Sequence, residues 1–506
     1  MKLRTLVWCA AGLAASASCG SSGLPEQVSG ERIVVTLEGG DPGSADNPLP
    51  ISFDPSAPFT IKLEMFRGDG SPDTDFNSYV RITSKPGTVF SVNGGQDGRN
   101  VKLQNGVADG VQVTIEASFG PTRIWAQDIG YVPGSITPGD PLPACSNGID
   151  DDGDGRVDYP ADPGCYASND DDETAGTGAT GVSPIIYYAL PRIADVRGGP
   201  TQSGTGTPFP FEQVDIDTGY DASSNAFRWD TIVTGLSSDG FFVTDLQDEN
   251  NDPQAGLGYG SVFAYTFSAP QKIGVCDRLR LLEGTSADFF GYTELNFPTW
   301  AVEYWDPNAR PCLVPDPVVL APGDWNNSPL MFKSESGLVR VLTDGTVTLH
   351  VGAHMGPGKP DATSGFLPVQ DANGVWETNC DLNGDGKVEF TNLNEAACAN
   401  ACEADNECTE FSSYLSQSGF TIVVTDGTTV AKAQGNASAA TSYDPVANAG
   451  QPLHAFTGLL RYFSGGNQFT IQARCDDDVV ADLNAPVLDS SHACVNQNGN
   501  IPDQQQ

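Results

Sequence analysis

Positive charge and histidine are scarce in this chain of 506 residues. Lysine and arginine total 25 against 65 aspartates and glutamates, which gives a formal net charge of −40, and there are 4 histidines. A surface of this charge repels phosphate backbones, so non-specific binding of nucleic acid is unfavourable without a local basic groove or divalent cations. With so few histidines, a metalloenzyme site with several imidazole ligands is not expected. These shortages argue against two large classes of function.

Long apolar runs are also scarce. After the N-terminus, no segment approaches the roughly 20 apolar residues that a membrane-spanning helix needs. The N-terminus itself has Lys2 and Arg4 before an apolar run at residues 6–15, and small residues follow. A basic start, a short apolar run and small residues are typical of a secretory signal. We therefore expect an exported protein.

Two processing sites compete at the end of this signal. Residues 15–17 fit an ordinary small-residue cleavage site, whereas Cys19 and the flexible stretch after it resemble the lipidated N-terminus of bacterial lipoproteins, although Ser16 stands where leucine is usual. The resemblance predicts a signal peptide at residues 1–18, a lipid on Cys19 and a tether at residues 19–31. It implies a membrane contact through the lipid anchor, on the outer membrane or cell surface of a Gram-negative-type bacterium. Free secretion is the alternative.

The 12 cysteines fit an oxidising compartment. Removal of the signal takes away Cys9 and lipidation uses Cys19, so the others can all pair. Proximity in the sequence predicts three disulfides, namely Cys145–Cys165, Cys276–Cys312 and Cys475–Cys494. Two further bridges, in an order left open, would join Cys380, Cys398, Cys402 and Cys408.

Apolar and polar residues alternate in short runs over most of the chain. Glycine and proline, 57 and 36 residues, cluster between these runs. Period-two alternation bounded by turn residues is typical of β-strands. For residues 32–136 it predicts a β-sandwich, within which residues 105–115 resemble bacterial Ig-like surface domains. An acidic linker at residues 137–184 follows.

An internal repeat organises the chain after this linker. Residues 240–245 correspond to residues 419–426, and residues 284–295 correspond to residues 458–471. Each half thus has a strand that ends in Thr-Asp and, later, a glycine-bounded hairpin. Two related β modules in tandem are the simplest account.

The repeat sets the predicted domain bounds. We expect one module at residues 185–312, a second at residues 313–478 and a C-terminal tail at residues 479–506. The second module would carry an insertion at residues 371–416, in which an Ala- and Glu-rich stretch at residues 393–416 predicts a helix.

An Asp-rich loop stands between Cys145 and Cys165. Acidic residues at alternating positions precede Gly155, which supplies a sharp turn, as in the EF-type loops that collect oxygen ligands for Ca²⁺. The candidate ligands are Asp150, Asp152, Asp154, Arg156, Asp158 and Asp162. The pattern resembles thrombospondin type 3 repeats and the Cys-bracketed Asp-rich linkers of secreted bacterial proteins. It predicts Ca²⁺ binding, and the alternative is a solvated acidic linker.

A second calcium signature follows Cys380. Its spacing before Gly386 resembles a single dockerin or EF-hand loop. The candidate ligands, with a backbone carbonyl offered by the lysine, are Asp381, Asn383, Asp385, Lys387, Glu389 and Asn392. Because Asn392 replaces the usual acidic residue, we expect weaker Ca²⁺ binding here. Dockerins carry two such repeats, so docking to a dockerin partner is not implied.

The first β module resembles the OB-fold domains that accompany secreted bacterial nucleases. The resemblance depends on the order of strands and glycines in residues 240–246, 260–265, 273–284 and 289–295. It implies a small, partly open barrel whose face can bind an extended ligand.

Nucleic acid is one candidate for that ligand. Single-strand binding needs stacking aromatics and a positive groove, and the candidates for these roles are Phe241, Phe242, Tyr265, Tyr292, Trp300, Lys272, Arg278 and Arg280. Acidic residues outnumber basic ones across this module, which argues against such binding. A saccharide or a protein needs no basic groove.

Together these patterns predict an all-β, multidomain protein: an Ig-like β-sandwich followed by two OB-like β-barrels, with a small helical EF-hand- or dockerin-like insertion. No catalytic motif is recognisable in the sequence. We predict a non-enzymatic cell-envelope lipoprotein, stabilised by Ca²⁺, that presents these domains to a protein or glycan partner. The alternative is an extracellular nucleic-acid-binding accessory protein.

Overall fold

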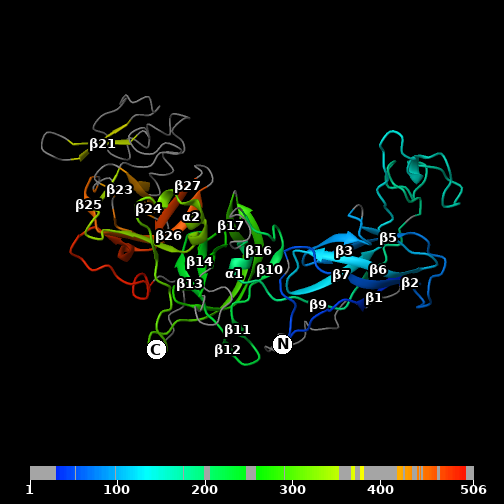
Figure 1. Ribbon diagram of the computed structural model, residues 1–506, viewed down its shortest axis with the longest axis horizontal. Coiled ribbons are helices and arrows are strands. Elements are labelled where there is room, and N and C mark those ends of the chain that lie inside the picture. Colours follow the sequence, from blue (N-terminus) through cyan, green and yellow to red (C-terminus); the bar gives the residue numbers. More distant parts are fainter. Residues whose placement is uncertain are drawn as a thin grey trace, which may run out of the picture. The chain divides into compact units, whose positions relative to one another are not determined.

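The computed structural model of the chain is mostly β (Figure 1). It describes residues 30–51, 53–96, 99–174, 176–198, 206–246, 258–289, 291–352, 366–370, 376–380, 419–424, 428–435, 441–443, 445, 448, 450–463 and 468–496. These residues include two short α-helices, α1 (Ile193–Val196) and α2 (Ser328–Ser334). The all-β class predicted from the sequence is confirmed. Among the described helices, none is both long enough and apolar enough to cross a membrane.

Several sequence predictions fall outside the described residues. These are the signal peptide with Cys19, the helix at residues 393–416, the second calcium signature from Asp381 to Asn392, and the pairing of Cys398, Cys402 and Cys408. Around the predicted insertion, the structure describes the antiparallel pair β21 (Phe366–Gln370) and β22 (Trp376–Cys380).

The chain divides into two compact units. The first comprises Met1–Ala45, Asp54–Glu116 and Pro121–Tyr187, and the second comprises Asp46–Phe53, Ala117–Gly120 and Tyr188–Gln506. The second unit therefore takes in two short segments that interrupt the first along the chain. The domain bounds drawn from the sequence stay predictions.

The first unit contains two antiparallel sheets. One has the strand order β1 (Arg32–Gly39), β2 (Phe59–Phe66), β6 (Val107–Glu116) and β4 (Thr88–Val92). The other has the order β5 (Asn100–Lys102), β3 (Tyr79–Lys85), β7 (Pro121–Gln127) and β8 (Thr180–Val182), and β9 (Ile186–Tyr187) also pairs with β7.

Alternation along these strands explains why they form sheets with one buried face. In β2, Phe59, Ile61, Leu63 and Met65 are buried, and the residues between them are half-buried. Successive side chains of a strand point to opposite faces, so this spacing gives each sheet one apolar face. β3 and β7 show the same alternation. The acidic linker, which includes the short 3₁₀ helix η1 (Ala144–Ser146), runs between β7 and β8.

The second unit contains a sheet that closes on itself. Its strand order is β10 (Gln213–Asp215), β16 (Arg278–Phe289), β13 (Thr231–Leu236), β14 (Gly240–Asp245), β15 (Ser261–Tyr265) and β17 (Tyr292–Glu303). β16 also pairs with β17, which completes the ring, and β15 and β17 run parallel. A small hairpin of β11 (Tyr220–Asp221) and β12 (Ala226–Phe227) follows β10 in the chain.

A second closed sheet follows in the same unit. Its order is β18 (Val318–Val319), β19 (Leu338–Leu342), β26 (Ala455–Phe463), β27 (Gln468–Ala473), β24 (Thr429–Gly435), β23 (Gly419–Val424), β20 (Leu349–Val351) and β25 (Pro452–Leu453), and β28 (Val479–Val480) pairs with β26. One residue separates β25 from β26, so a single stretch of chain pairs with β20 at one end and with β19 and β27 further on, which closes the sheet. β24 and β27 run parallel.

The sequence repeat falls on equivalent strands of these two sheets. Residues 240–245 form β14, and residues 419–424 form β23. The run β14-β15-β17-β16 in the first sheet corresponds to the run β23-β24-β27-β26 in the second, with a parallel pair at the same place in each.

The two sheets of the second unit share an apolar contact. Phe242, Phe263 and Tyr292 of the first sheet belong to one buried cluster with Leu338 and Leu459 of the second. Separate apolar clusters fill each sheet. The disulfides Cys276–Cys312 and Cys475–Cys494 form here as predicted from proximity.

Candidate metal centre

The predicted calcium loop lies in the first unit and is closed by a disulfide. Cys145 and Cys165 are bonded to each other and buried. After Cys165 the chain returns along the loop, where the fully buried carboxylate of Asp170 accepts hydrogen bonds from three backbone N–H groups. Burial raises the pKa of Asp170 in spite of these donors. The disulfide and Asp170 together fix the return path of the chain.

A first group of carboxylates consists of Asp150, Asp152 and Asp154, which bring one oxygen each within 4.8 Å of the others. Asp150 accepts hydrogen bonds from the N–H groups of Gly153 and Gly155, at 2.8 and 3.0 Å. Both glycines have left-handed backbones, with φ of 79° and 89°, which lets the turn fold tightly. The alternating acidic residues seen in the sequence therefore do converge.

A second group consists of Asp152, Asp162 and Glu173, again with one oxygen each within 4.8 Å of the others. Asp162 and Glu173 are each only 2% exposed. Asp162 accepts a hydrogen bond from the N–H of Gly164 through Oδ1, at 2.6 Å. Its Oδ2 is buried and has no hydrogen-bond partner. Asp152 belongs to both groups and links them.

Glu173 is held in this group by the backbone of the loop. Its Oε2 accepts the N–H of Asp151 at 2.6 Å, and its Oε1 accepts the N–H of Asp158 at 3.2 Å. The chain passes so close that a Cβ on Gly164 would lie 1.6 Å from the carbonyl oxygen of Glu173. Only glycine fits at position 164 without a backbone shift.

The predicted ligand set did not include Glu173. Two features of the sequence pointed to it: the acidic run at residues 170–173, and the disulfide that returns the chain to the loop. The EF-type pattern covers a short continuous loop, so it does not extend to a ligand beyond the closing cysteine.

The electrostatics of the site are those of uncompensated negative charge. Burial, together with the charges of Asp154, Asp162 and Asp150, raises the pKa of Asp152. Like charges within a few ångströms disfavour simultaneous ionisation. The arrangement is therefore suited to hold a cation between the two groups.

Two predicted ligands lie apart from these groups. Asp158 has a left-handed backbone, with φ of 54°, and its carboxylate accepts the N–H of Gly148 at 3.0 and 3.1 Å. It thus fastens the start of the loop. Arg156 is exposed and donates its N–H to Asp154 at 2.8 Å. Among the described residues, neither belongs to a converging carboxylate group.

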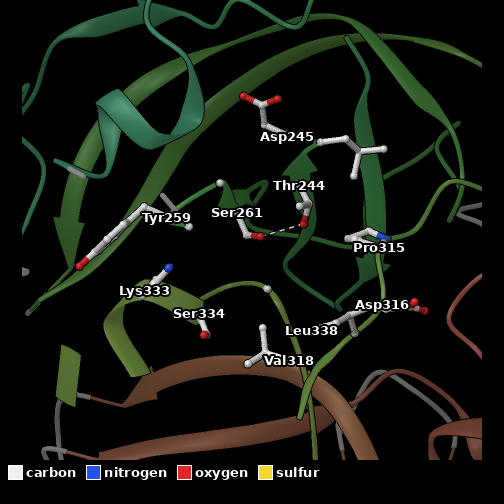
Figure 2. A pocket seen from close by; sticks show the side chains of 14 residues that line it. Thr244, Asp245, Tyr259, Ser261, Pro315, Asp316, Val318, Lys333, Ser334 and Leu338 are labelled. Atoms are coloured by element: carbon white, nitrogen blue, oxygen red, sulfur yellow. Dashed lines mark hydrogen bonds between the residues drawn. The ribbon is translucent and has the colours of Figure 1, made fainter. Parts of the chain in front are cut away.

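A cavity of about 280 Å³ lies in the second unit, between the end of β14, the start of β15, α2 and the start of β19 (Figure 2). The hydroxyls of Thr244 and Ser261 bond to each other across one wall at 2.8 Å, and Lys333 extends toward the cavity from α2. The chain between two of its lining residues, Leu246 and Gly258, lies outside the described part. All of the residues that line the cavity belong to the second unit.

The aromatic candidates for nucleic-acid stacking are mostly core residues. Phe241, Phe242 and Tyr292 are buried, at 0%, 0% and 2% exposure. Trp300 packs edge-on against Phe241, with ring centroids 5.1 Å apart. Tyr265 is half-buried at the edge of the cluster that joins the two sheets.

The basic candidates are largely neutralised. Arg278 pairs with Glu303 at 2.5 Å and with Asp230 at 2.9 Å, and Arg280 pairs with Glu303 at 3.1 Å. Lys272 is exposed. These ion pairs leave little net positive charge on this surface for phosphate.

Comparison of the chain with protein-family profiles, with curated proteins and with solved structures finds no match in any of the three.

Proposed function

We propose that the protein is a non-enzymatic cell-envelope lipoprotein, stabilised by calcium, that presents its β modules to a protein or glycan partner. The observation that carries the calcium assignment is the Oδ2 of Asp162, which is buried without a hydrogen-bond partner in a group with Asp152 and Glu173. An ionised carboxylate in this situation is costly, and two more carboxylates nearby add repulsion. A divalent cation removes both costs.

The chemistry of the donors favours calcium among divalent cations. The converging side chains offer carboxylate oxygen only, because Cys145 and Cys165 are joined in a disulfide. Hard cations prefer oxygen, and Ca²⁺ accepts six to eight oxygens in flexible geometry, whereas Mg²⁺ demands a near-ideal octahedron and keeps several waters. Five carboxylates on an irregular loop suit the more flexible ion.

The topology supports the finer fold assignments. In the second unit, each closed sheet has a five-strand run with one parallel pair, which is the arrangement expected of OB-like barrels. The two antiparallel sheets of the first unit agree with an Ig-like sandwich. A lipid on Cys19 would tether these modules to a membrane, so that they act as a binding scaffold.

Nucleic acid is the less favoured partner. An OB-like barrel usually offers the face of its second and third strands to ligands, and here those strands are β14 and β15. Their residues Phe242 and Phe263 are buried in the cluster that contains Leu338 and Leu459 of the next module. The neighbouring arginines are paired with carboxylates. A protein or glycan that binds another surface needs neither the face of these strands nor unpaired arginines.

Calorimetry on the full chain tests the calcium assignment. Protein stripped of cations should release or absorb heat on titration with Ca²⁺, and Ca²⁺ should raise the midpoint of thermal unfolding. Asp162→Asn keeps the side-chain shape but removes the charge, so we expect roughly tenfold weaker binding or more.

Two further variants make this test specific. Asp151→Asn changes an exposed carboxylate of the same loop that bonds Asn147 and lies in neither converging group, so binding should be unchanged. Asp385→Asn removes a candidate ligand of the second signature and separates its contribution. The assignment would be contradicted if the wild-type chain showed no heat of Ca²⁺ binding and no shift in its thermal unfolding midpoint. Equal Ca²⁺ affinities of D162N and D151N would contradict it as well.

A further inference from the structure

Three phenylalanines of the second unit combine high exposure with a left-handed backbone. Phe211, Phe297 and Phe267 are 83%, 71% and 56% exposed, with φ of 64°, 54° and 61°. A large apolar ring is unfavourable in solvent. A left-handed backbone is unfavourable for any residue that has a Cβ. Strained residues persist where the surrounding structure holds them, and they cluster at binding sites. Two of the three, Phe267 and Phe297, contact each other.

A β-bulge presents Phe297. Two residues of β17, Phe297 and Pro298, lie opposite Gly284 alone on β16. A bulge of this kind re-aims a side chain and is frequent beside binding sites. Here it turns the ring of Phe297 out of the sheet and toward solvent.

The rings of Tyr265, Phe267 and Phe297 form a continuous row, which we call the aromatic platform. Centroids of Tyr265 and Phe267 are 4.2 Å apart, and those of Phe267 and Phe297 are 4.9 Å apart. Tyr265 in turn contacts Phe263, which is buried, at 6.3 Å. The platform is thus anchored in the core at one end and exposed at the other.

Uncharged residues flank the platform along the chain. Residues 264–270 and 295–299 contain no Asp, Glu, Lys, Arg or His. The N–H of Thr266 donates a hydrogen bond to the carbonyl oxygen of Asp239. The carboxylate of Asp239 accepts a hydrogen bond from the hydroxyl of Ser237 and lies 3.8 Å from Arg461. In a chain with net charge −40, these uncharged flanks offer no counter-charge to an ionic polymer.

We propose that the aromatic platform binds a neutral saccharide chain. Sugar rings stack their C–H faces on aromatic rings, whose faces carry partial negative charge, and neutral hydroxyl and amide groups can bond the sugar hydroxyls. The proposal rests on the proposed function as a binding protein and narrows its partner to a glycan.

Titration of the full chain with cellohexaose and with chitohexaose, by calorimetry, tests the platform. We expect at least one of the two neutral oligosaccharides to bind, and Phe267→Ala and Phe297→Ala each to weaken that binding about tenfold. Phe211→Ala is the matched control, because Phe211 is also highly exposed and left-handed but lies outside the platform. The Phe211→Ala variant should bind the oligosaccharide with the affinity of the wild type.

The outcomes separate this proposal from its alternatives. Absence of binding to both oligosaccharides, or equal losses in F211A and F297A, would overturn it. Self-association in sedimentation that F297A abolishes, with no saccharide binding, would overturn it in favour of a second copy as occupant. Because the platform needs no cation, saccharide binding should persist in EDTA, so failure of the calcium assignment and failure of the platform are distinguishable.

Discussion

Gly164 shows how a single residue decides whether the carboxylates of the candidate metal centre can come together. Its backbone carries no left-handed strain; the constraint is the carbonyl of Glu173, which a Cβ would approach to 1.6 Å. The close approach lets Glu173, beyond the disulfide, share a site with Asp152. Position 164 therefore controls the distance between the two parts of the chain that supply carboxylates.

Gly164→Ala should separate these parts. Overpacking of this kind costs about 1–3 kcal/mol, and the shift of Glu173 should weaken Ca²⁺ binding. Titration calorimetry and thermal unfolding of the variant, with and without Ca²⁺, measure both effects. Gly95→Ala is the control, since a Cβ there would meet Val92 at an ordinary 3.5 Å. Equal Ca²⁺ affinity in the two variants would show that the close approach is irrelevant to the site.

At the scale of elements, the pairing of β10 with β16 places two acidic residues directly opposite each other. Asp215 faces Glu283 across the pair. Like charges in this position are destabilising. Burial, followed by the charges of Glu283 and Asp217, raises the pKa of Asp215 to about 6.

This shift predicts a pH dependence of stability. The ordinary pKa of Asp215 is 3.8 and the folded value is about 6, so between these values the folded chain holds a proton that the unfolded chain has lost. The free energy of unfolding should therefore fall as pH rises from about 4 to about 6. Asp215→Asn should remove this fall and raise the unfolding midpoint at pH 7 by roughly 2–4 °C, with no gain at pH 4.

Asp221→Asn provides a control of opposite sign. Hydrogen bonds from Ser223 and Ser224 lower the pKa of Asp221 to about 2, so its ionised form stabilises the fold at neutral pH. This variant should lower the midpoint at pH 7. A gain in stability from both variants, or from neither, would contradict the role assigned to the carboxylate pair.

A structural feature of this chain can be predicted from the sequence when it depends on residues close together along the chain. Alternation in β2 and the turn glycines Gly153 and Gly155 are local signals, so the strands and the convergence of the first carboxylate group could be predicted. Ring closure, the parallel pair of β15 with β17, and the approach of Glu173 depend on contacts between distant residues. No period or motif encodes such contacts.

At the scale of the whole molecule, the second unit depends on short segments from early in the chain. Phe119 is 2% exposed and its ring lies 4.6 Å from that of Phe209, in edge contact. Phe53 contacts the same ring at 5.4 Å. The domain ranges predicted from alternation and from the repeat are contiguous, and neither segment differs in pattern from the strands around it, so the sequence gives no sign of this arrangement.

Phe119→Ala in the full chain tests this dependence. Removal of a buried phenylalanine costs about 3–5 kcal/mol, so the midpoint of denaturant unfolding of the second unit should fall. Intrinsic fluorescence of Trp229 and Trp300, both in that unit, can report it. Phe211→Ala, which removes an exposed ring, should change the midpoint little. Equal midpoints for the two variants would mean that residues 117–120 are dispensable to that core.

The same interleaving has a consequence for the order of folding during synthesis. The strands of the first unit emerge early, but Phe53 and Phe119 emerge with them and must wait for Phe209 before their rings can be covered. Until then the nascent chain exposes two aromatic side chains, although most strands of the first unit have already been synthesised. Such transient apolar surface is what chaperones recognise and what promotes aggregation. The folding of the nascent chain is thus constrained by the two early segments that belong to the second unit.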